Sequence, residues 1–181
     1  MSSSSTSPSV DTYPPDCGVC QENSGKKEIP HGIIWENNNW LLRHTPPPYG
    51  IAGWFTLQAK RHVPHAGYFN DIETTEIGPL MKKFCTIIQT VTKCEKVYLA
   101  ALGESHPHFH LHFVPRYDTN NDYQSITNTV SSDGTSTSNK TPTTKGWTVF
   151  QAGGEAAAGK LSVDSKHVET IIAQVKVALQ E

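Results

Sequence analysis

The sequence predicts an antiparallel α+β domain, and three observations support this fold class. Several short stretches rich in β-branched and aromatic residues, separated by turn residues, predict strands. A stripe of apolar residues at helical spacing, from Ile77 to Val91, predicts one long helix between the third and fourth strands, and a second stripe from Val168 to Leu179 predicts a C-terminal helix. The resulting order is strand, strand, strand, helix, strand, strand, helix, which is typical of an antiparallel sheet crossed by one long helix.

The strands and the long helix can be placed by their boundary signals. Three asparagines at 37–39 form a hairpin turn between the first two predicted strands, and three prolines at 46–48 end the second. Asn70 and Glu73 form a capping-box pattern that starts the long helix. The predicted strands cover residues 31–36, 40–44, 54–60, 96–102 and 106–116, and the C-terminal helix covers residues 164–179.

The 181-residue chain is long enough for one well-buried domain, which we place at residues 16–181. Residues 1–15 are rich in Ser, Thr and Pro and predict a disordered tail, and a Ser/Thr/Asn-rich stretch at about 119–145 predicts a mobile insertion. We expect residues 146–150 to return to ordered structure.

Composition excludes several classes of function. The net charge of −2 gives no general attraction to nucleic acid or to an anionic membrane. No apolar run approaches the roughly 20 residues that a membrane helix needs, and the N-terminus lacks the basic and apolar regions of a signal peptide. Four cysteines are too few for a disulfide scaffold, so we expect a reducing compartment, the cytoplasm first and the nucleus second.

The fifth predicted strand carries histidines at every second position. Because successive side chains of a strand point to opposite faces, these imidazoles are expected to share one face while the intervening apolar side chains enter the core. The histidines are His106, His108, His110 and His112, and the core residues are Phe109, Leu111 and Phe113. Aligned imidazoles suit nucleophilic attack on phosphorus and equally suit a metal cluster, and the periodicity does not choose between them.

Cys17 and Cys20 form an isolated Cys-x-x-Cys pair. A redox role is poorly supported because no strand-helix-strand context surrounds the pair. Zinc favours two thiolates and two imidazoles, and the chain offers histidines, although two free cysteines in a loop remain an alternative. Cys85 and Cys94 lie on the helix stripe and at its end, where we expect packing roles.

The stretch His108–Val114 resembles the histidine triad motif, in which three histidines alternate with apolar residues, and Pro115 and Arg116 follow as in many members. The resemblance covers roughly residues 17–116. It implies a histidine-triad-like fold and a nucleotide hydrolase or transferase that acts on a nucleoside 5′-phosphate derivative, such as a dinucleoside polyphosphate or a nucleotide phosphoramidate. Members of the family often pair as homodimers.

The resemblance also implies roles for individual residues. His110 would be the nucleophile that forms a covalent nucleotidyl-histidine, with His108 and His112 completing the triad and His112 contacting the phosphate. Ser105 resembles a phosphate-contacting serine, and Arg116 either contacts phosphate or pairs with a carboxylate. The transferase branch carries glutamine where this chain has His112, so hydrolysis is the expected reaction.

Some branches of the family carry a structural zinc site, and by resemblance its ligands here would be Cys17, Cys20, His62 and His108, with His65 and His106 in reserve. Two departures from the family pattern favour a second hypothesis, a zinc-stabilised nucleotide-binding module with little catalysis. Glu104 stands where many relatives have glutamine, and the stretch from His44 to Pro47 lacks the carboxylate that holds the ribose in common relatives.

Overall fold

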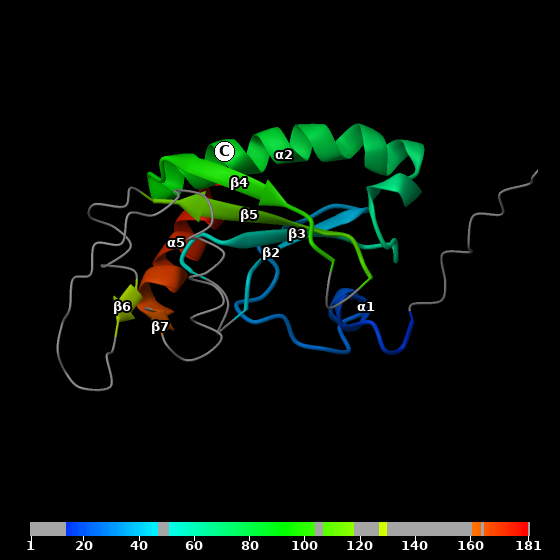
Figure 1. Cartoon of the computed structure of the whole chain (residues 1–181), viewed down its shortest axis with the longest axis horizontal. Helices are drawn as coiled ribbons and strands as arrows, with labels where there is room; N and C mark the ends of the chain where they lie inside the picture. The colour runs from blue at the N-terminus through cyan, green and yellow to red at the C-terminus, as the bar shows by residue number, and fades with distance from the viewer. Residues whose placement is uncertain are drawn as a thin grey trace, which may run out of the picture.

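The structure is a computed structural model that describes residues 14–46, 51–103, 107–117 and 165–180, together with the backbone of residues 127–129 and 161–163. Its architecture confirms the predicted α+β fold, with an antiparallel sheet, a long crossing helix and a C-terminal helix (Figure 1). Most of the predicted tail and insertion, and the predicted return at 146–150, lie outside the described residues.

One five-stranded antiparallel sheet forms the centre of the molecule, with strand order β1-β2-β3-β5-β4. Residues paired across the central strands are Arg43, Thr56 and His112 in one row and Leu41, Gln58 and His110 in the next. Directly paired residues of an antiparallel sheet point to the same face. The strands are β1 (Trp35–Glu36), β2 (Trp40–His44), β3 (Phe55–Ala59), β4 (Lys96–Ala100) and β5 (His110–Arg116).

The opposite face of this sheet forms the core together with two helices, α2 (Asp71–Thr92) and α5 (Ser165–Ala178). The predicted core residues Phe109, Leu111 and Phe113 are buried there. Asn70 caps α2 as predicted: its side chain accepts from the Glu73 backbone N–H, and the Glu73 carboxylate accepts from the Asn70 backbone N–H. In Figure 1, α2 runs along the sheet on the side away from the short helix α1 (Gly18–Asn23).

Three features differ from the prediction. The segment after Cys17, for which no helix was predicted, forms helix α1. The first strand is reduced to two residues because His31 and Gly32 adopt positive φ angles of 64° and 72°, which interrupt an extended chain. A further pair of strands, β6 (Thr127–Thr129) and β7 (Leu161–Val163), forms a separate two-stranded sheet that the composition did not predict.

None of the helices in the described part of the chain is both long enough and apolar enough to cross a membrane.

Candidate active site and metal centre

The sheet face opposite the helices carries polar side chains from three neighbouring strands, and we call it the histidine face. Its members are Arg43 of β2, Thr56 and Gln58 of β3, and His110 and His112 of β5. The register brings them together, because His110 and His112 lie directly across from Gln58 and Thr56. Arg43, Thr56 and Gln58 are buried, whereas His110 and His112 are partly exposed. A ligand from solvent therefore meets the two imidazoles before it meets the other members.

His110 is held by its own strand. Its Nδ1 lies 2.7 Å from the backbone carbonyl oxygen of His108. A carbonyl oxygen only accepts, so Nδ1 carries the proton, and in the neutral ring the lone pair belongs to Nε2. An imidazole oriented in this way has its nucleophilic nitrogen on the side away from the backbone.

The contacts of His112 place its proton on the other ring nitrogen. The indole Nε1–H of Trp54 donates to Nδ1 of His112 at 3.1 Å, and the Thr56 hydroxyl lies 3.4 Å from the same nitrogen. An indole N–H only donates, so the neutral ring of His112 carries its proton on Nε2. Burial, together with the nearby His110 and Arg43, lowers the pKa of His112 to about 4. His112 is therefore a neutral hydrogen-bond donor at neutral pH, next to His110, with ring centroids 5.0 Å apart.

A second cluster lies at the N-terminal end of β5. Four residues each offer one potential metal-ligand atom, and these four atoms all lie within 4.8 Å of one another. The residues are Cys17, Cys20, His62 and His108. The Sγ atom of Cys20 is 3.2 Å from Nδ1 of His62 and 3.3 Å from Nδ1 of His108, and Cys17 Sγ is 3.5 Å from the latter nitrogen. The structure thus brings together the four residues that the resemblance implied as ligands.

The chemistry of this cluster fits a tetrahedral metal ion. Bond lengths typical of zinc place a sulfur and a nitrogen ligand about 3.5 Å apart, close to the distances above. The Nε2–H of His108 donates to the Ala59 carbonyl oxygen at 2.7 Å, which directs the Nδ1 lone pair toward the sulfurs. Burial and the adjacent Cys17 thiol raise the pKa of Cys20 to about 12, so two thiolates here require a cation between them.

Helix α1 joins the cluster to the histidine face. It carries Cys20, and two residues later Glu22, whose buried carboxylate lies 3.1 Å from Nε of Arg43. Asn23 accepts from Gln58 Nε2 at 2.7 Å and donates to the Ala59 carbonyl oxygen at 2.9 Å. These contacts place α1 against the β2–β3 half of the histidine face.

The remaining predicted site residues do not join either cluster in the described structure. Arg116 is buried at the far end of β5, where its guanidinium lies 2.5 Å from Glu95 Oε1, the carboxylate-pairing alternative of the sequence analysis. The reserve ligand His65 instead accepts from the Gly67 backbone N–H at 3.2 Å. Ser105 and His106, together with Glu104, lie outside the described residues.

Sequence reasoning missed Trp54, Arg43 and Glu22 as parts of the site. The alternation of polar residues in the third strand, Thr56 and Gln58, was a signal that this strand shares the polar face. The pairing of Glu22 with Arg43 had no such signal, because it depends on the unpredicted helix α1.

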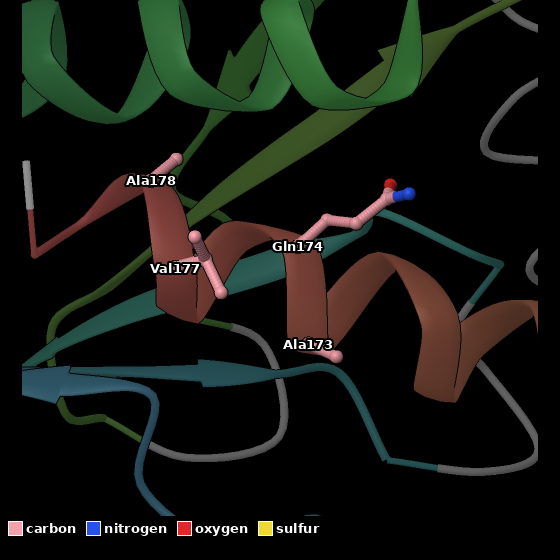
Figure 2. A pocket seen from close by; sticks show the side chains of 4 residues that line it. All are labelled: Ala173, Gln174, Val177 and Ala178. Atoms are coloured by element: carbon pink, nitrogen blue, oxygen red, sulfur yellow. The ribbon is translucent and has the colours of Figure 1, made fainter.

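A surface hollow of about 310 Å³ lies on a different element, α5, and is lined by Ala173, Gln174, Val177 and Ala178 (Figure 2). Its described lining contains no titratable or nucleophilic side chain. This hollow therefore offers no group for catalysis.

No known family model matches the sequence, and no curated protein matches it. Solved structures do match the fold. A hypothetical histidine triad nucleotide-binding protein from Sulfolobus tokodaii superposes with a TM-score of 0.58, at 13% identity over 91% of this chain and 92% of that chain. A Hit-like protein involved in cell-cycle regulation from Bartonella henselae superposes with a TM-score of 0.56, at 9% identity over 92% of this chain and 99% of that chain.

A Zn-bound histidine triad family protein from Mycobacterium smegmatis also matches, with a TM-score of 0.51 and 15% identity over 90% of this chain and 97% of that chain. Identities this low show a shared fold. The chain therefore has the histidine triad fold.

Proposed function

We propose that this protein is a phosphohydrolase that cleaves a nucleoside 5′-phosphate derivative through a covalent intermediate on His110. The observation that supports this most directly is the opposite protonation of two adjacent imidazoles. The contacts of His110 leave a lone pair at Nε2, and those of His112 leave a proton at Nε2. A nucleophile beside a neutral donor is the pair that attack on a phosphoryl group requires.

In the first step, the Nε2 lone pair of His110 attacks the α-phosphorus and forms a P–N bond while the bond to the leaving group breaks. The leaving group departs with that bonding pair and takes up a proton from solvent. The Nε2–H of His112 donates to a phosphoryl oxygen, where negative charge is concentrated. In the second step, water attacks phosphorus and releases a proton to solvent, the P–N bond breaks, and the nucleoside monophosphate leaves as His110 regains its lone pair.

We also propose that the four-residue cluster binds zinc in a structural role. Four protein ligands fill a tetrahedral site, which leaves no position for substrate. Zinc supplies charge neutralisation for the two buried thiolates and a fixed link between α1 and the start of β5. The Zn-bound Mycobacterium smegmatis protein of the same fold supports this choice of metal.

The nucleophile is tested by replacing His110 with alanine and assaying a dinucleoside polyphosphate and a nucleotide phosphoramidate with water as the only acceptor. Loss of a covalent nucleophile lowers kcat by about a thousandfold or more. His65→Ala is the matched control, because His65 is exposed and lies outside both clusters, and its activity should equal that of the wild type. Activity of His110→Ala within about tenfold of wild type would reject the proposal.

A specific observation favours one alternative, a nucleotide-binding module with little catalysis. Common relatives hold the ribose with a carboxylate in the segment that here contains Thr45. In this chain the Thr45 hydroxyl bonds instead to the Thr56 hydroxyl, with 3.0 Å between the two oxygens, so this segment supplies no carboxylate to hold a ribose. Calorimetry with a non-hydrolysable nucleotide, beside the turnover assay, separates the two functions: binding without turnover favours the module. Product that appears only when a second acceptor is added identifies a transferase.

A further inference from the structure

We infer that Trp54 is a positioning residue that fixes His112 in the neutral form protonated at Nε2, an inference that rests on the proposed function. Trp54 would act on the reaction through His112. Its indole Nε1–H lies 3.1 Å from His112 Nδ1, and the two rings meet edge-on with centroids 5.7 Å apart.

The indole is well placed to control the imidazole because it is itself held rigidly. Trp54 is 7% exposed and packs in a small apolar cluster with Ile51, Val114 and Tyr117. Its backbone N–H donates to the carbonyl oxygen of Ile51 at 3.0 Å, and its carbonyl oxygen accepts from the Thr45 N–H at 2.8 Å. The position of Nε1 relative to β5 is therefore set by the fold.

Among the polar neighbours of His112 that the structure describes, Trp54 dictates which nitrogen carries the proton. The Thr56 hydroxyl is 3.4 Å from Nδ1, and it can either donate or accept because it also bonds to Thr45. The indole N–H has no acceptor capacity, so Nδ1 must keep its lone pair. A second proton on Nδ1 would place two N–H groups against each other.

The charged and titratable groups that face His112 in the described structure also disfavour a proton. His110 lies beside it on β5, and Arg43 lies beyond Thr56 on β2; both carry positive charge or can acquire it. Trp54 and Thr56 face it from β3 and the turn before it, and Ala100 is its partner on β4. Trp54 adds to these effects by bonding only to the neutral ring.

The test is a comparison of Trp54→Phe with Trp40→Phe. Both changes remove an indole N–H from a buried ring, but Trp40 lies on the opposite sheet face, and its Nε1 has no hydrogen-bond partner in the described structure.

Nitrogen NMR of ¹⁵N-labelled histidine, assigned with His112→Gln, measures the pKa and the protonated nitrogen of His112. Trp54→Phe should raise this pKa by about half a unit to one unit, the equivalent of one hydrogen bond, and partly protonate Nδ1. Trp40→Phe should leave both unchanged.

With a nucleotide substrate, Trp54→Phe should lower kcat by about tenfold with a smaller change in KM, because His112 donates most strongly when charge develops in the transition state. An unchanged His112 pKa and protonation pattern in Trp54→Phe would overturn the inference. The wild-type spectrum tests it without any variant, since a neutral His112 protonated at Nδ1 would also overturn it. If the wild type shows the expected spectrum but no turnover, the proposed function fails while the positioning by Trp54 stands.

Discussion

Two histidines two positions apart on one strand acquire different chemical character from single neighbouring atoms. The carbonyl oxygen of His108 accepts from His110 and so keeps its proton on Nδ1, whereas the indole N–H of Trp54 donates to Nδ1 of His112 and so keeps the proton of that ring on Nε2. A third histidine, His108, turns its Nδ1 toward two sulfurs because Nε2–H donates to the Ala59 carbonyl oxygen. Histidine thus serves three different roles in this chain, and in each case the hydrogen-bond partner of one ring nitrogen determines the role.

The metal centre is tested with two histidines of one loop. His62→Ala removes a proposed ligand, and His65→Ala removes the nearby reserve histidine, which lies outside the cluster. We expect about one equivalent of zinc in wild type and His65→Ala, and less than about half an equivalent in His62→Ala, because three remaining ligands hold the ion weakly. Elemental analysis of protein prepared without chelators measures this. Equal loss of zinc in both variants would contradict the ligand assignment.

At the residue scale, the motif predicted which side chains meet but not how they are protonated. The alternation in this strand was sufficient to place His110 and His112 on one face and Phe109, Leu111 and Phe113 in the core. The grouping of Cys17, Cys20, His62 and His108 followed from the resemblance, since their separations in the chain carry no geometric information. The contact from Trp54 to His112 depends on the sheet register, which no local pattern specifies.

At the scale of elements, helix α1 links the metal centre to the histidine face. Sequence reasoning missed it because six residues are too few for a clear apolar period, and Cys17 at its N-cap makes no side-chain capping bond. Contacts with the rest of the fold stabilise it instead: the cysteines at one end, and Glu22 and Asn23 at the other. The long helix α2, by contrast, was predictable from its capping box and apolar stripe.

The docking of α1 is tested by removing the charge of Glu22. Glu22→Gln leaves the buried guanidinium of Arg43 without its carboxylate, which should lower the free energy of unfolding by about 3 kcal/mol. Glu36→Gln is the matched control, because Glu36 pairs with Lys60 at the surface, and its loss should cost less than about 1 kcal/mol. Urea unfolding of zinc-loaded protein measures both values, and equal costs would show that the buried pair does not hold α1.

At the scale of the whole molecule, two histidines whose pKa values are lowered in the folded chain should make stability depend on pH. Burial lowers the pKa of His44 on the core side and of His112 on the histidine face, each to about 4 from an ordinary 6.5. Between these values the unfolded chain binds protons that the folded chain does not. Stability is therefore fully present above pH 6.5 and falls as the pH drops toward 4, by about 1.4 kcal/mol per unit for each histidine.

His44→Asn isolates one of these contributions, since the asparagine amide can replace the bond that His44 Nδ1–H donates to the Thr45 carbonyl oxygen at 2.8 Å. The variant should lose about 1.4 kcal/mol less stability per pH unit than wild type between pH 6.5 and 4. Urea midpoints across this range measure the difference. Parallel pH profiles for the two proteins would contradict the assignment to His44.

The overall fold was predictable because it follows from periodicity along the chain: two apolar helical stripes and five short strands in a fixed order. The sheet order β1-β2-β3-β5-β4 was not, since strand pairing between distant segments leaves no local pattern. That order places Thr56 beside His112 and Gln58 beside His110, and so creates the polar face on which the proposed chemistry depends.

The covalent attachment of a nucleotide to His110 can be detected by rapid-quench peptide mass spectrometry. A nucleoside 5′-phosphate with an aryl ester leaving group should give a burst of leaving group equal to the enzyme concentration. We expect one nucleoside monophosphate on the peptide that contains residues 108–116, located at His110 and absent from His110→Ala. Turnover without any adduct, or an adduct on His112 instead, would contradict it.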